Sequence, residues 1–576
     1  MSAGRPTLTM SKLLLLKSTS DLHSVANLLG LKPAHLAYNL YKKSAAEKYK
    51  KFEIPKRYGG KRVICAPIAD FKHIQRLLAV VLMECLDEIN AKYNRQAAHG
   101  FITKRSILTN AQQHRGRGHV LNLDQQDFFG SINFGRVRGF FIADKDFALQ
   151  PAVATVLAQI ACFENALPQG GPASPVISNL IGNVLDTHLI KLARKNGCVY
   201  TRYADDLTFS TNLPSFPEEL AILKGGVWTT GAALLKVIKQ SGFDVNTSKV
   251  RMQFEDSQQS VTGLVVNQKV NTAASYRSSI RAMAKNLFKT GSFTHDSFTK
   301  DLAGTVSKQA EAGTMAQLQG MFGHVKHVDE FNLQVRNQEI PVGRARLYKR
   351  FFLFSQFYCT PRPVILCEGK TDNIYLLHAI RSRASHFPQL AEISLTGKLT
   401  LLIRIFKYVE RKAGRTIGMS GGDGEVSKFI GAYLTEVSKH FKAPGVSQHP
   451  VILVVDHDTG GKGPYETASK KVSKSLEILK PFEHVAANLY LVPTPLPLGA
   501  SSSCIEDCFQ PATLAKTLGG KTFNYKDKKL KPTEYGKSYF AEHVVKAEAD
   551  TIDFSGFDPL LDRIKSAIAH YATLPK

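Results

Sequence analysis

The sequence has few of the features that mark secreted, zinc-binding or membrane-spanning proteins. It contains eight cysteines in 576 residues, and no two of them form a CxxC pair, so zinc ribbons are not expected. Most of these cysteines lie in apolar runs, as in reduced proteins whose cysteines pack as small hydrophobic residues. There is no run of about 18 apolar residues that would span a membrane. The apolar run Leu13 to Leu16 is too short for a secretion signal, so we expect a cytoplasmic protein.

Acidic residues are scarce relative to basic ones. The chain has 75 Lys and Arg against 48 Asp and Glu, a formal net charge of +27. So large an excess indicates a polyanionic partner, and nucleic acid comes first because lysine and arginine release the counterions condensed on phosphates. A basic but merely well-solvated surface is the alternative reading of the charge. Hydrophobic residues make up 43% of the chain, enough for several folded domains.

The periodicity of apolar residues predicts a succession of segments. Residues 1–50 are mainly helical, and a hairpin is predicted around the turn Gly59-Gly60. Short strands are predicted at 120–123, 199–203 and 207–209, and the stretch from about 273 to 333 reads as helical. After Pro361 and Pro363, apolar strands at 364–366 and 451–455 alternate with helical stretches, which predicts a parallel α/β domain.

Two groups of aspartates are candidates for metal binding. Asp205 and Asp206 stand between two predicted strands, and Asp124 ends another strand before Phe128-Phe129. Adjacent carboxylates repel each other unless a cation lies between them, and oxygen ligands favour Mg²⁺ over zinc. Two magnesium ions about 4 Å apart can activate a hydroxyl and stabilise a leaving pyrophosphate.

These residues lie in motifs that resemble those of reverse transcriptases. Tyr203-Ala204-Asp205-Asp206 is similar to the YxDD box, and the segment from Leu123 to Phe129 resembles the first metal-binding segment. The segment from Leu167 to Pro175 resembles the LPQG…SP loop. The resemblance implies an RNA-directed DNA polymerase with Asp124, Asp205 and Asp206 as the catalytic metal ligands of a two-metal site. It also implies deoxynucleotide contacts, made by Lys56, Arg62, Phe129 and Gln169.

Two further motifs narrow the resemblance. The segment from Asn110 to His114 matches the NAxxH motif of retron reverse transcriptases, and Val261-Thr262-Gly263 matches their VTG motif. The resemblance implies that these residues bind RNA: Asn110, His114, Val261, Thr262 and Gly263. A retron enzyme binds its own structured noncoding RNA and copies part of it into a branched RNA–DNA hybrid, msDNA. For His114 alone, a structural role is the default.

A second acidic group follows the strands of the C-terminal part. Glu368 comes directly after the strand 364–366, and Asp456 and Asp458 come after the strand 451–455. Because the carboxyl ends of parallel strands meet at one crevice, these side chains predict a second site for one or two Mg²⁺ ions. Glu-Gly after one strand and Asp-x-Asp after another resemble a TOPRIM domain. The resemblance implies catalytic and metal-binding roles for Glu368, Asp456 and Asp458. Glu506 could add a further carboxylate to this site, and a surface acid explains it equally well.

The two resemblances predict an architecture. We expect mixed α/β and α+β domains, with a right-hand polymerase fold followed by a Rossmann-like TOPRIM domain. The expected boundaries are a helical N-terminal region at 1–50, fingers and palm at 51–270, an RNA-binding thumb at 271–350 and the TOPRIM domain at 355–576.

Three functional readings stay open. The first is a retron reverse transcriptase fused to a TOPRIM nuclease of the overcoming-lysogenisation-defect type, which would act in bacterial antiphage defence on a nucleic-acid target. The second is a reverse transcriptase with a non-catalytic TOPRIM-like binding module. The third, an enzyme like those of group II introns, is expected to carry a maturase or endonuclease segment. Self-association is left open in all three.

Overall fold

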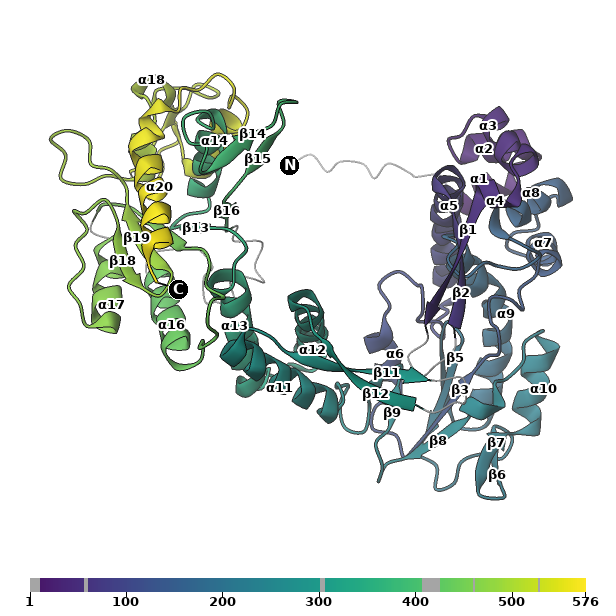
Figure 1. Ribbon diagram of the computed structural model, residues 1–576. Helices are drawn as coiled ribbons and strands as arrows, with labels where there is room; N and C mark the ends of the chain where they lie inside the picture. The colour runs from purple at the N-terminus through teal and green to yellow at the C-terminus, as the bar shows by residue number, and fades with distance from the viewer. Residues whose placement is uncertain are drawn as a thin grey trace. The chain divides into compact units, whose positions relative to one another are not determined.

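The computed structural model describes residues 11–55, 61–300, 306–406, 425–458, 461–526 and 529–575, apart from the side chains of 298–300 and 306. The chain divides into two compact units, coloured from purple to teal and from teal to yellow in Figure 1. Unit 1 consists of Met1–Arg277, Asp296–Ala310 and Gly323–Glu339, and unit 2 of Ser278–His295, Glu311–Phe322 and Ile340–Lys576.

The N-terminal part of unit 1 is helical, as predicted. Four short helices occupy it: α1 (Lys12–Lys17), α2 (Leu22–Leu28), α3 (Pro33–Ala37) and α4 (Ala45–Lys48). Polar side chains fix where they begin, since Asp21 and Ser44 form capping boxes at the starts of α2 and α4. Their apolar faces bury Leu16, Val25 and Leu36 in the main core of the unit.

The predicted hairpin is confirmed on both sides of its turn. Strands β1 (Tyr49–Pro55) and β2 (Lys61–Pro67) pair antiparallel, with Tyr49 opposite Pro67 and Pro55 opposite Lys61. The turn, which includes Lys56 and Gly59-Gly60, lies outside the described residues. The helix α5 (Ala69–Tyr93) follows and buries apolar side chains at helical spacing, among them Phe71, Ile74 and Leu78.

A four-stranded antiparallel sheet forms the centre of unit 1. Its order is β4-β5-β3-β8, from strands β4 (Val199–Tyr203), β5 (Asp206–Thr211), β3 (His119–Asp124) and β8 (Arg251–Phe254). All three strands predicted in this region are therefore confirmed. The pairing of β3 with β5 sets Asp124 directly opposite Asp206, and this register decides the geometry of the acidic site.

Further helices and two small hairpins lie between Met1 and Arg277 in unit 1. The helices are α6 (Ile107–Gln113), α7 (Phe134–Ala143), α8 (Pro151–Ala161), α9 (Ser174–Lys195) and α10 (Ala232–Gln240). The hairpins pair β6 (Ala221–Lys224) with β7 (Val227–Thr230) and β9 (Ser260–Val261) with β10 (Leu264–Val265). The longest of these helices, α9, is buried along most of its length.

The expectation of an entirely helical segment from 273 to 333 is wrong in its middle. Helices α11 (Ala274–Thr290) and α12 (Met315–Arg336) are present, but a hairpin of β11 (Thr294–Lys300) and β12 (Val306–Ala312) separates them. The strand β11 has one apolar residue, Phe298. A strand without apolar alternation gives no period-two signal in the sequence.

Unit 2 is built on a five-stranded sheet, and the predicted parallel α/β arrangement is found. Its order is β16-β13-β17-β19-β18, from β16 (Arg404–Ile405), β13 (Val364–Cys367), β17 (Val451–Val455), β19 (Leu489–Pro493) and β18 (Glu483–Ala486). The first four are parallel, and only the edge strand β18 runs antiparallel. All residues of β13, β17 and β19 are buried, as expected for strands covered on both faces.

The remaining elements of unit 2 surround this sheet. The helices are α13 (Val342–Leu353), α14 (Asp372–Ser382), α16 (Glu425–Lys439), α17 (Lys462–Val472), α18 (Pro511–Leu514), α19 (Lys537–Phe540) and α20 (Asp558–Thr573). Two small sheets pair β14 (Ala391–Ile393) with β15 (Leu399–Leu401) and β20 (Thr522–Phe523) with β21 (Glu534–Tyr535). No helix in the described residues is both long and apolar enough to cross a bilayer.

Candidate functional site

Three carboxylates meet at the end of the central sheet of unit 1. Asp124 is the last residue of β3 and lies opposite Asp206, the first residue of β5. Asp205 lies in the turn between β4 and β5, and its carbonyl accepts a hydrogen bond of 3.0 Å from the backbone N–H of Gln125. The sheet register therefore brings together the three aspartates that the sequence singled out.

The negative charges of these three carboxylates repel one another. Burial, followed by the charges of Asp205 and Asp124, raises the pKa of Asp206 to about 7. Burial is also the main reason why the pKa of Asp205 is raised, and Asp124 adds to it. Carboxylates in this situation gain from a cation between them, and their oxygen-only donor set suits Mg²⁺.

Lys249 supplies one positive charge to the group. Its Nζ lies 2.8 Å from Asp124 Oδ2, and both residues line a hollow of about 380 Å³ together with Asp206 and Arg251. Within the described residues, no group of three or more His, Cys, Asp or Glu side chains is arranged to hold a metal ion as it stands. Because the Lys249 ammonium contacts Asp124 directly, a cation bound by Asp124 would have to displace this contact. Lys249 was missed from the sequence because it is 125 residues away from Asp124.

The turn that carries Asp205 is held from two sides. Tyr203 pairs with Asp206, so Ala204 and Asp205 form a two-residue turn, and Ala204 has a φ of 55°. A positive φ is unfavourable for a residue with a Cβ atom and persists only where the surroundings fix it. The Nη1 of Arg202 donates to the Ala204 carbonyl at 3.2 Å. On the other side, a Cβ built on Gly100 would lie 2.6 Å from the Ala204 nitrogen.

A buried ion pair positions Arg202. The guanidinium donates from Nε and Nη2 to the two carboxylate oxygens of Asp186, at 2.9 and 2.8 Å. Arg202 is 0% exposed, and Asp186 is 3% exposed. This bidentate geometry is the strongest arrangement available to the pair, and it links α9 to the turn that carries Asp205.

The four residues predicted to contact the nucleotide have different surroundings. Arg62, on β2, is exposed, and its charge acts on Asp205. Phe129 is half-buried against Phe128. The carbonyl of Gln169 accepts a 2.9 Å hydrogen bond from the Cys65 N–H, which ties the LPQG loop to β2. Lys56 lies outside the described residues.

The predicted RNA-binding motifs meet each other inside unit 1. The hydroxyl of Thr201 donates to Asn110 Oδ1 at 2.6 Å, so it accepts from Nε2 of His114 at 2.7 Å. Nδ1 of His114 then accepts from Ser210 Oγ at 2.7 Å. His114 is 0% exposed and Asn110 is 1% exposed, so their hydrogen bonds are made within the protein. RNA contact through these side chains stays a prediction.

The VTG motif forms a tight turn next to this network. Thr262 and Gly263 have φ values of 47° and 80°, as in the two-residue turns that join twisted strands. Val261 is fully buried, and Thr262 Oγ1 donates to the Ile107 carbonyl at 3.3 Å, at the start of α6. The turn is thus anchored to the helix that carries the NAxxH motif, and RNA contact by Val261, Thr262 or Gly263 is likewise a prediction.

A second acidic cluster lies at the carboxyl ends of β13 and β17 in unit 2. Glu368 Oε2 accepts from the backbone N–H of Asp456 at 3.4 Å, and Asp456 Oδ1 accepts from that of Ile505 at 3.1 Å. Burial, with the charges of Asp372, Glu368 and Glu506, raises the pKa of Asp456 to about 8. Asp458 is exposed, and its Oδ1 accepts from the Gly461 N–H at 2.8 Å.

Two further carboxylates lie in this cluster. Asp372, which was not expected from the sequence, is 7% exposed at the start of α14. Glu506, for which the sequence left open a place in this site or on the surface, is 0% exposed, and Lys537 Nζ donates to its Oε2 at 3.0 Å. Glu506 Oε1 is buried without a partner among the described residues. The carboxylates here again form an oxygen-only donor set, and burial raises the pKa of both Asp456 and Glu506.

Comparisons with known proteins agree with the geometry of unit 1. A family model described as "Reverse transcriptase (RNA-dependent DNA polymerase)" matches residues 54–267. The retron Mx162 and Mx65 reverse transcriptases of Myxococcus xanthus are 34% and 36% identical over 42% and 41% of this chain. The chain spans about half the length of these two relatives, 53% and 55%.

A third relative is matched over more of its length. The retron Ec86 reverse transcriptase of Escherichia coli is 31% identical over 272 residues, which are 47% of this chain and 78% of the relative. The aspartates of the polymerase motifs meet at one end of the sheet, and the identity to the Ec86 enzyme extends over most of that relative. The chain therefore belongs to the retron reverse transcriptase family.

Proposed function

We propose that the chain is an RNA-directed DNA polymerase that copies part of its own structured noncoding RNA into msDNA. The observation that carries this proposal is the meeting of Asp124, Asp205 and Asp206 at the adjoining ends of β3 and β5. The order of the motifs along the chain and the family to which the chain belongs support the same reaction. The substrates would be deoxynucleoside triphosphates and a primed RNA template.

Magnesium is the cofactor that fits the donor set. Asp124, Asp205 and Asp206 would hold it, and when bound it would activate the primer hydroxyl and stabilise the leaving pyrophosphate. Lys249 would give up its contact with Asp124 and offer its charge to the phosphates of the substrate. Arg202 and Gly100 would keep the turn of Asp205 in place throughout.

The substrate side of the site would be formed by the hairpin and the LPQG loop. Arg62, together with Lys56, would offset the charge of the triphosphate, because cations stabilise developing phosphate charge. Phe129 would lie under the sugar and exclude a 2′-hydroxyl. The hydrogen bond between Gln169 and Cys65 would make the loop and β2 act as one wall.

A single substitution tests the polymerase. Asp206→Asn removes one charge from the site and is expected to lower primer extension on an RNA template by at least about 100-fold. Asp256→Asn is the matched control, because Asp256 is exposed on the loop after β8. Equal extension by Asp206→Asn and the control would contradict the proposal.

We further propose that the acidic cluster of unit 2 is the magnesium-dependent nuclease site of a TOPRIM-like domain. Its support is the position of Glu368 and Asp456 at the ends of adjacent parallel strands, next to the buried Glu506 and Asp372. One or two Mg²⁺ ions held there would assist phosphodiester cleavage, and Asp458 would join them. Such an effector, joined to a retron polymerase, would act in bacterial antiphage defence.

The nuclease is tested separately from the polymerase. In a chain already inactivated by Asp206→Asn, we expect Mg²⁺-dependent cleavage of DNA or RNA, and Glu368→Gln should abolish it. Glu466→Gln, on the exposed face of α17, is the control. Phage protection or growth arrest that survives Glu368→Gln in a folded chain would favour the alternative, a non-catalytic binding module.

A further inference from the structure

A groove in unit 2 runs between α13 and α16. It has a volume of about 720 Å³, and two helical stripes with the same spacing line it. One stripe is formed by Val342, Ala345, Arg346 and Lys349, and the other by Ala432, Thr435, Glu436 and Lys439. Because residues at i, i+3, i+4 and i+7 share one face of a helix, each helix presents a whole face to the groove.

Small residues form the middle of the groove, and long cations form its walls. Ala345 and Ala432 leave the space between the helices unfilled. Around them lie the cations Arg346, Lys349, Arg350 and Lys439, together with the imidazole of His440. The Nζ of Lys471, on α17, adds a further charge next to the groove, since it donates to Thr435 Oγ1 at 3.3 Å.

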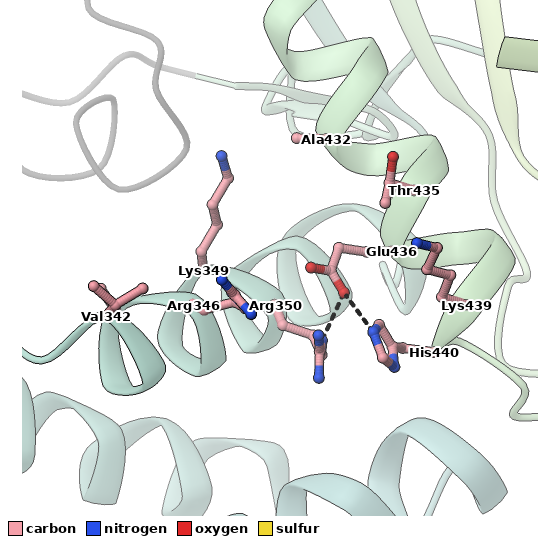
Figure 2. A pocket seen from close by; sticks show the side chains of 10 residues that line it. Val342, Arg346, Lys349, Arg350, Ala432, Thr435, Glu436, Lys439 and His440 are labelled. Carbon is pink, nitrogen blue, oxygen red and sulfur yellow. Dashed lines mark hydrogen bonds and ion pairs between the residues drawn. The ribbon is translucent and has the colours of Figure 1, made fainter.

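The single acid of the lining is already neutralised. Glu436 Oε2 accepts from Arg350 Nε at 2.6 Å and lies 3.8 Å from His440 Nε2. Figure 2 shows both side chains reaching Glu436, while Lys349 extends away from this group. In the part of the chain that the structure describes, Arg346, Lys349 and Lys439 have no carboxylate partner. The groove therefore has an excess of positive charge.

This face of α16 is not needed to build the core. The helix buries Val426, Phe429, Ile430, Tyr433 and Leu434 on its other side. The residues that line the groove are half-buried or exposed. Cations held along an open groove that packing does not require indicate a ligand that is extended and anionic.

We propose that this groove binds the phosphodiester backbone of a nucleic-acid strand. Cations three residues apart on a helix have Cβ atoms about 5–6 Å apart, so Arg346 and Lys349 can contact successive phosphates along one strand. Contacts of this type hold the strand without reading its sequence. A compact anion such as a single nucleotide would leave most of these cations unused, and an acidic protein segment is the competing occupant.

The experiment measures strand binding by the full chain without deoxynucleotides, so its result does not depend on either proposed activity. Arg346→Gln/Lys349→Gln is compared with Lys428→Gln/Lys470→Gln, which removes the same charge from exposed positions outside the lining. Fluorescence anisotropy with labelled single-stranded RNA and DNA of one sequence gives the affinity and its dependence on salt.

The expected result is a loss that is specific to the groove. The first pair should weaken binding at least about fivefold relative to the control pair. It should also lower the slope of log K against log salt by about 1.4, which is about 0.7 for each lost phosphate contact on a single strand. The oligonucleotide, RNA or DNA, whose affinity falls more in the groove variant is identified as the preferred strand. Equal affinities and slopes for the two pairs would overturn the proposal.

A cross-linking experiment locates the strand. A photoreactive benzoylphenylalanine replaces Ala345 in the full chain, and a second variant carries it at Lys428. Cross-links to the oligonucleotide at position 345 and not at 428 support the proposal. Cross-links at 345 to polyglutamate but not to either oligonucleotide would overturn it in favour of an acidic protein partner.

Discussion

His114 is buried in an uncharged form and so links the stability of unit 1 to pH. Burial, with smaller effects from His99 and Arg117, lowers its pKa to about 3, whereas a histidine in an unfolded chain titrates near about 6.5. Below that pH the unfolded chain takes up a proton that the folded chain does not. The contribution of His114 is thus complete above about pH 6.5 and is lost as the pH falls toward the folded pKa.

Replacing this histidine should flatten the acid side of the stability curve. For His114→Gln we expect the free energy of unfolding to fall less steeply between pH 6 and pH 4, by about 1 kcal/mol per pH unit. Denaturant unfolding of unit 1 at several pH values measures the slope. His188→Gln is the control, because His188 is exposed on α9. Slopes that match in both variants would show that His114 is protonated in the folded chain.

Single residues also show how far the sequence predicts a site. Asp124, Asp205 and Asp206 were found because each stands in a local motif at the end of a strand. Lys249, Asp372 and Lys537 were not found, because their contacts depend on the folded arrangement of distant segments. The place of Glu506 was left open for the same reason, since a single acid in the sequence carries no sign of its burial.

The turn between β4 and β5 depends on an element far away in the sequence. Gly100 packs against the backbone of Ala204, where a Cβ atom would lie 2.6 Å from a nitrogen that cannot move without moving the turn. Gly100→Ala is expected to shift Asp205 and to lower primer extension on the order of 100-fold, because small displacements of reacting groups have effects of this size. Steady-state extension assays and the melting temperature measure the two consequences.

A helical glycine provides the control for this change. Gly139 lies within α7, and a Cβ added there would have no atom within 4 Å. Gly139→Ala should leave extension unchanged. If Gly100→Ala also extends normally, the turn is not held by this contact.

At the level of elements, strands were predictable where their residues are buried. The strand β17 is found at the predicted residues, because a run of five apolar residues between turns is typical of a buried strand and too short for a helix. The hairpin of β11 and β12 was missed because its residues are mostly polar and no core fixes their pattern. The pairing of β3 with β5 was not predicted, since register depends on distant segments; the resemblance implied only that Asp124, Asp205 and Asp206 share metal ions.

The two units have separate cores, and we expect them to unfold separately. A core of unit 1 lies between Leu16 and Val245, and a core of unit 2 lies between Ile365 and Tyr571. Asp186→Asn leaves the buried Arg202 without its counter-charge, which typically costs about 3–5 kcal/mol. Tyr433→Phe leaves the buried Asn488 without a donor to Oδ1, at a cost of about 1–3 kcal/mol.

Scanning calorimetry of the whole chain tests this expectation. Two transitions should appear, with Asp186→Asn lowering the midpoint of one and Tyr433→Phe lowering that of the other. A single transition that both substitutions shift equally would show that the units unfold together.

The salt bridge between Lys249 and Asp124 has a consequence for the proposed binding of magnesium. The Lys249 ammonium is covalently part of the chain and cannot diffuse away. It therefore partly neutralises the carboxylates even when free magnesium is scarce. A magnesium ion bound as proposed would have to displace the Lys249 ammonium from Asp124, and this competition would lower its apparent affinity. Synthesis would then begin at a threshold of free magnesium, and a neutral side chain at position 249 would lower it.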